Sequence, residues 1–124
     1  IYKMGINNTQ TSYSFGQLGS MFIDVTTNDI KPPLGKVFVA ITVIEDCTFD
    51  NSGGLIADIE NEDRGLQYVG TDKEAHNANP RTTALGIGGK KIQDDDTFQA
   101  GLTIYGRWTT IDLASGAVIA YIGD

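Results

Sequence analysis

The segment at residues 97–123, TFQAGLTIYGRWTTIDLASGAVIAYIG, decides the fold class of this chain. Between residues 104 and 113 it is dominated by residues that suit a pleated, half-buried surface. A second apolar run covers residues 117–122, after the turn-forming sequence Ala114-Ser115-Gly116. The segment therefore predicts two long strands joined in a C-terminal hairpin.

The rest of the chain extends this β pattern. Residues 36–45, KVFVAITVIE, are apolar at both sets of alternating positions, which predicts a central strand buried on both faces. The turn-forming run at 50–54 predicts a second hairpin, between this strand and one at 55–60. Further short strands are predicted at 11–15, 20–26 and 82–87, and no segment of about ten residues keeps a helical period. We therefore expect an all-β, single-domain antiparallel sandwich, of which a jelly roll is one form.

Two segments outside the strand patterns are candidates for contact with a partner. Residues 1–10 place Ile1, Tyr2, Met4 and Ile6 among polar residues, which suits a short strand or an N-terminal arm that docks elsewhere. Residues 61–80 are mostly polar and predict a long surface loop, a kind of segment that often carries function.

Composition narrows the classes of function. A chain of 124 residues forms one domain, and because Cys47 is its only cysteine, it contains no intrachain disulfide. The formal charge of −7 argues against a nucleic-acid binder, since affinity for phosphate depends on Lys and Arg. No signal-peptide pattern occurs, and no apolar run approaches the roughly 18 residues that suggest a membrane span. We expect a soluble protein able to fold in a reducing cytoplasm; why it begins at Ile1 without Met is left open.

The residues that can carry chemistry do not form a recognisable catalytic or metal-binding motif. His76 has no neighbouring His or Cys to complete a zinc site, and Asp94-Asp95-Asp96 lacks the alternating ligand positions of a calcium loop. The run at 86–91, GIGGKK, lacks the Ser or Thr and the helix of a phosphate loop. Cys47 is expected to be a small, buried apolar side chain. We therefore expect no catalytic residue, no cofactor and no metal.

Basic and aromatic residues mark further candidate contacts. Lys90 and Lys91 are the only adjacent basic pair and can meet an acidic partner surface, although solvation is the default. On an alternating strand, Tyr105 and Arg107 share one face while Trp108 lies on the other. We expect Trp108 to be buried and the other two to point outward. The candidate partner contacts are Ile1, Tyr2, Met4, Ile6, His76, Lys90, Lys91, Tyr105 and Arg107.

Four strings of strand and turn residues carry a resemblance to known proteins. They are YSFGQLGS at 13–20, GKVFVAIT at 35–42, IYGRWT at 104–109 and AYIG at 120–123. In these strings and in its overall pattern of strand and turn residues, the chain resembles small virion structural proteins of tailed bacteriophages, especially phages of marine cyanobacteria. Together the strings run through most of the chain.

The resemblance implies a noncatalytic component of a virion, made in the host cytoplasm, with the major capsid protein or other virion proteins as partners. We also expect a homo-oligomer or a many-copy assembly, and neither nucleic acid nor a membrane as a partner. Capsid decoration is the role we expect first, and the acidic charge favours the outer head surface over an interior packed with DNA. A tail- or fibre-associated receptor-binding module is the first alternative. The second is a small carbohydrate-binding or hydrolytic domain, which requires an aromatic platform or two facing carboxylates.

Overall fold

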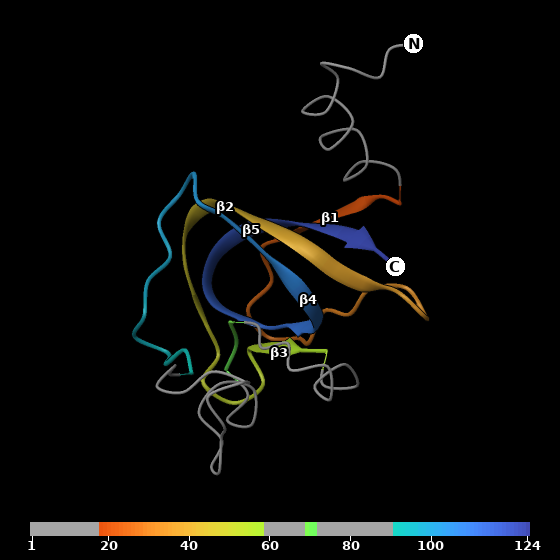
Figure 1. Ribbon diagram of the computed structural model, residues 1–124. Coiled ribbons are helices and arrows are strands. Elements are labelled where there is room, and N and C mark those ends of the chain that lie inside the picture. The colour runs from red at the N-terminus through yellow and green to blue at the C-terminus, as the bar shows by residue number, and fades with distance from the viewer. Residues whose placement is uncertain (1–17, 59–68, 72–90) are drawn as a thin grey trace, which may run out of the picture.

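The computed structural model describes residues 18–58, 69–71 and 91–124, and these form one antiparallel sheet without a helix (Figure 1). The predicted arm at 1–10 and the strands expected at 11–15 and 82–87 lie outside the described residues. The all-β prediction is confirmed for the described part, while the sandwich and the jelly roll stay predictions. The strands are β1 Ser20–Ile23, β2 Val37–Phe49, β3 Leu55–Ala57, β4 Thr103–Ile111 and β5 Leu113–Gly123, arranged in the order β1-β5-β2-β4-β3.

The central strand is β2, as the apolar run at 36–45 predicts. It pairs with β5 along one edge and with β4 along the other. The ladder with β5 changes register at four places, and such irregularities increase the local bend and twist of a strand. Accordingly, β5 follows a wide curve in Figure 1. The first irregularity, at Val39, also breaks the regular alternation expected from sequence, because Phe38 and Ile41 both lie in the core.

The predicted C-terminal hairpin is wrong. Only Asp112 separates β4 from β5 along the chain, yet β2 lies between these two strands in the sheet. The expected turn at 114–116 lies inside β5, where Gly116 has a φ of 85°. A Cβ atom on Gly116 would lie 2.3 Å from the carbonyl oxygen of Asp46. Gly116 therefore permits the close approach of β5 to β2 and does not reverse the chain.

The second predicted hairpin is also replaced by another pairing. Residues 50–54 do form a turn between β2 and β3, but β3 pairs with β4. Asp112 joins both sides of this turn: the Asp50 amide donates to its carbonyl at 2.9 Å, and its own amide donates to Gly54 at 2.7 Å. The turn thus spans the β4–β5 junction.

One side of the sheet encloses the core. Trp108 is fully buried, as predicted, and its indole Nε1 donates a 2.6 Å hydrogen bond to the carbonyl of Val69, so the polar atom of the ring is satisfied. The rings of Phe49 and Phe98 meet edge to face, with centroids 5.3 Å apart. The largest fully buried side chains are Trp108, Phe38, Phe49, Ile41, Leu55, Ile111, Leu113, Val43, Val118 and Cys47.

The described part of the predicted surface loop is packed into the fold. Gly70 and Thr71 are buried, and Thr71 exchanges hydrogen bonds with Leu55: its amide donates to the Leu55 carbonyl at 2.8 Å, and its Oγ1 accepts from the Leu55 amide at 2.9 Å. The Ile92 amide donates to Gly70 at 2.8 Å. The surface-loop prediction is therefore wrong for these residues. Positions 61–68 and 72–80 lie outside the described residues.

Candidate protein-interaction face

The side of the sheet that faces away from the core carries a regular array of eight side chains. The antiparallel registers align them in two rows across β1, β5, β2 and β4, because directly paired residues point to the same side of a sheet. The hydroxyls of Thr42 and Thr103 lie 2.9 Å apart, as expected for neighbours on one side. We call this array the open face. Its first row is Phe22, Ile119, Thr42 and Thr103, and its second is Ser20, Tyr121, Ala40 and Tyr105.

Exposure separates the open face from the core side of the same strands. Phe22 is 63% exposed and Tyr105 is 65% exposed, whereas Ile23, which follows Phe22 on β1, is 2% exposed, and Ile104, which precedes Tyr105 on β4, is partly buried against the core. Ile119, Tyr121, Thr42 and Thr103 are half-buried, and Ala40 is buried. Two large rings therefore project at diagonally opposite corners of the array.

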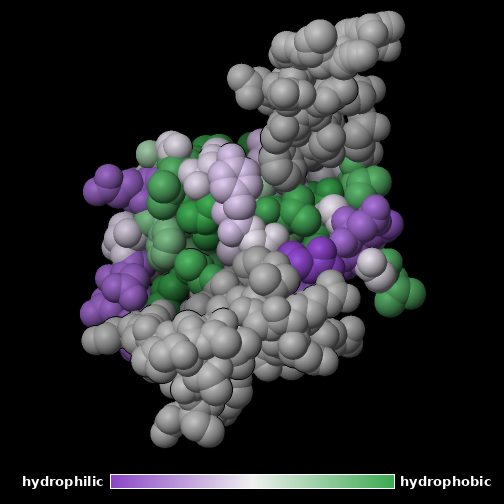
Figure 2. Space-filling view, viewed as in Figure 1, coloured by the Kyte–Doolittle hydropathy of each residue, from purple (hydrophilic) through white to green (hydrophobic). Residues whose placement is uncertain are grey.

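The open face is chemically distinct from the rest of the chain. None of its eight side chains is charged, although charged residues make up 20% of the sequence. Figure 2 shows one face of the molecule, on which hydrophobic and weakly polar residues lie together with strongly hydrophilic residues at the sides. Depletion of charge together with exposed aromatic rings is typical of the centre of a protein–protein interface.

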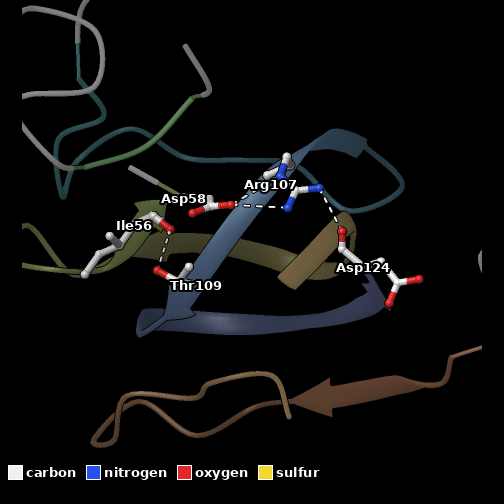
Figure 3. Close-up of polar contacts among 5 residues, drawn as sticks. All are labelled: Ile56, Asp58, Arg107, Thr109 and Asp124. Carbon is white, nitrogen blue, oxygen red and sulfur yellow. Dashed lines mark hydrogen bonds and ion pairs between the residues drawn. The ribbon is translucent and has the colours of Figure 1, made fainter. Parts of the chain in front are cut away.

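Arg107 is held by a polar network near the end of β5 (Figure 3). Its Nε and Nη2 atoms both lie 3.3 Å from Oδ2 of Asp58, and Nη1 donates to the backbone oxygen of Asp124 at 2.9 Å. Lys36 pairs with the Asp124 carboxylate. Two residues, Gly106 and Arg107, stand opposite Val39 alone, so the ladder is irregular between Tyr105 and Trp108. Tyr105 points outward as predicted, while Arg107 is only partly exposed and bonded within the chain.

Of the other residues predicted to contact a partner, the structure describes only Lys91. Lys91 is half-buried beside Ile92. Ile1, Tyr2, Met4, Ile6, His76 and Lys90 lie outside the described residues. Their roles as partner contacts stay predictions, as do those of Tyr105 and Arg107.

Cys47 behaves as the sequence predicts. It lies within β2 with none of its surface exposed, and burial raises the pKa of its thiol to about 11, with the nearby Asp46 charge adding to the effect. The thiol is therefore protonated near neutral pH and packs as a small apolar group, because the thiolate is the nucleophilic form.

Among the carboxyl groups of the described residues, Asp112 has an unusual environment. Burial raises its pKa, and a hydrogen bond with the Asp29 side chain and the charge of Asp50 act in the same direction. One of its oxygens is buried without a hydrogen-bond partner.

Within the described ranges, no group of three or more His, Cys, Asp or Glu side chains is arranged to hold a metal ion. These ranges also contain no helix long and apolar enough to cross a bilayer.

Sequence reasoning missed three large members of the open face, namely Phe22, Ile119 and Tyr121. Their alternation with Ile23, Val118 and Ile122 was a usable signal. The predicted hairpin obscured this signal, because it paired β5 with β4, whereas the neighbours of β5 in the sheet are β1 and β2. Comparison with protein-family models, curated proteins and solved structures gave no significant match.

Proposed function

We propose that the chain is a noncatalytic virion structural protein, a capsid decoration protein on the outer surface of a phage head, which joins neighbouring protein subunits through its open face. The observation that supports a binding role is the pair of large exposed rings, Phe22 and Tyr105, on an uncharged sheet face. Exposed aromatic rings on a surface without charged side chains are typical of interaction sites.

The charge distribution suits such a role. A formal charge of −7 keeps separate copies soluble before assembly, while the uncharged open face can be buried without desolvating an ion. Binding only to the mature shell would stabilise that shell by mass action. We assign attachment to the shell to the predicted arm at residues 1–10 and to β1, which is a short edge strand among the described residues and so can pair with another chain.

Electron microscopy of particles made with and without this chain tests the proposal. We expect density on the outside of the head that is lost when the chain is absent. Loss of density from the tail would instead support the receptor-binding alternative. Particles that never contain the chain would contradict both roles.

The open face also favours a second candidate, carbohydrate binding. Tyr105, Tyr121 and Phe22 supply aromatic surface, and Ser20, Thr42 and Thr103 supply hydroxyl groups. Aromatic rings offer a rigid apolar face with, in tyrosine, a polar tip. A glycan array tests this role, with Tyr105→Ala as the variant and Leu34→Ala, at a fully exposed site away from the array, as the control. If the unmodified protein binds no glycan on the array, carbohydrate binding is excluded.

A further inference from the structure

We infer that the neighbour bound by the open face is a second copy of this chain, related by a two-fold axis that runs parallel to the strands between β5 and β2. The inference rests on the proposed function in taking the open face as the protein-binding surface, and it names the partner. It follows from the order of large and small side chains across the four strands.

The two rows are self-complementary in size under this symmetry. A two-fold axis along the strands places β1 of one copy over β4 of the other, and β5 over β2, without exchanging the rows. In the first row, Phe22 then meets Thr103 and Ile119 meets Thr42. In the second row, Tyr121 meets Ala40 and Tyr105 meets Ser20. Every large side chain is opposed by a small one.

The other simple symmetry does not give this match. An axis perpendicular to the strands exchanges the rows, so that Ile119 meets Tyr121 and Thr42 meets Ala40. Two large side chains would then collide at one position and two small ones would leave a gap at another. Because well-packed interfaces approach the density of protein interiors, the first arrangement is favoured.

Charge and geometry fit the same partner. Two acidic chains repel, but neither open face brings a charged side chain to the other. Two sheets that pack face to face lie about 10 Å apart with their strands nearly aligned. The dimer is thus a two-layer β-sandwich in which each copy supplies one sheet; this differs from the sandwich expected from sequence, which lies within a single chain.

Sedimentation velocity over a dilution series tests for the dimer. We expect a concentration-dependent dimer for the unmodified chain and a weakening of at least about 30-fold for Phe22→Glu, because a charge would be buried against Thr103 of the second copy. Tyr105→Glu is a second variant with the same expectation. Leu34→Glu is the control, since Leu34 is fully exposed and outside the array, and its dimer should be unchanged. A chain that is monomeric at every concentration overturns the inference.

A cross-linking experiment tests the axis. Phe22→Cys and Thr103→Cys proteins are mixed and treated with a short bismaleimide. We expect the mixture to cross-link, while Phe22→Cys alone does not, because three strand spacings of about 4.8 Å separate the two Phe22 positions across the dimer. Cys47 is fully buried and does not compete. Preferred cross-linking of Phe22→Cys to Ser20→Cys would show the perpendicular axis and overturn the arrangement.

The outcomes separate this inference from the proposed function. If the chain is monomeric in solution and its Phe22→Glu variant still gives density on the head, the proposed function stands and the dimer is excluded. A dimer with the expected cross-link, together with particles that lack the chain, removes the virion role while the interface stands.

Discussion

The two sides of the four strands β1, β5, β2 and β4 differ in what their side chains do. On one side Ile23, Val118 and Ile41 are almost fully buried and hold the strands together. On the other, the large rings of Phe22 and Tyr105 are mostly exposed. Burial of apolar area is the main favourable term in folding and in association. The difference teaches that the packed side stabilises the monomer, while the open side leaves large rings exposed, as the interface we propose requires.

The largest expected effect compares the two sides on β4. Trp108→Ala should lower the free energy of unfolding by about 3 to 5 kcal/mol, because it removes a fully buried ring. Tyr105→Ala should change it by less than about 1 kcal/mol in the monomer. Urea unfolding at concentrations where the chain is monomeric measures both. Equal losses would contradict the assignment of the two sides.

A second comparison sets a packed glycine against an open one. Gly116→Ala should cost about 3 kcal/mol or more, because its positive φ strains any side chain and the new Cβ would meet the backbone of Asp46 and Cys47. Gly35→Ala carries only the strain of its φ of 80°, roughly 1 kcal/mol, since nothing lies within 4 Å of its Cβ. Thermal unfolding of both variants measures the difference. Similar costs would show that β5 does not approach β2 so closely.

A third comparison concerns two threonines. Thr71→Val should cost about 1 to 3 kcal/mol, because the buried Leu55 amide loses its 2.9 Å bond to Oγ1. Thr109→Val should cost less than about 0.5 kcal/mol, since its hydroxyl makes only a 3.5 Å contact with the Ile56 carbonyl. Hydrogen exchange at the Leu55 amide should accelerate in the first variant alone. Unchanged protection would argue against the packing of residues 69–71 on β3.

The smallest expected effect is a pH dependence at the β4–β5 junction. The pKa of Asp112 is raised in the folded state, so this group lowers stability as pH rises from its ordinary value of 3.8 through the folded pKa. Asp112→Asn should therefore raise the melting temperature at pH 7, and the gain should vanish below pH 3.8. Asp94→Asn, at an exposed turn, is the control and should change little. A loss of stability at pH 7 in Asp112→Asn would contradict the crowding of Asp29 and Asp50 around it.

The local patterns predicted much of the strand content. The strands around residues 20, 40, 55, 108 and 118 all occur, and the burial of Trp108 and Cys47 is confirmed. These predictions hold because alternation and β propensity depend on residues that are near in sequence. The pairings failed because a Gly between two apolar runs is equally compatible with a turn and with a bulge. Only the contact of Gly116 with residues 46 and 47 of β2 distinguishes them.

The candidate site was predicted only at Tyr105. Exposure of this ring follows from alternation on one strand, but the array around it depends on which strands are neighbours. The predicted hairpin would have placed β4 beside β5, whereas β2 separates them. Phe22 and Tyr105 belong to one array only because β5 and β2 lie between β1 and β4.

The sequence by itself determined that the segments around residues 20, 40, 55, 108 and 118 would form strands, that Trp108 would enter the core and that the chain would be acidic, because these properties belong to single residues and short windows. Only the tertiary structure decided that β2 separates β4 from β5, that Asp112 bonds to both ends of the turn at residues 50–54 and that eight uncharged side chains share one face. The physical reason is that strand order and register are set by contacts between residues far apart in the chain, whose competing arrangements differ little in local preference.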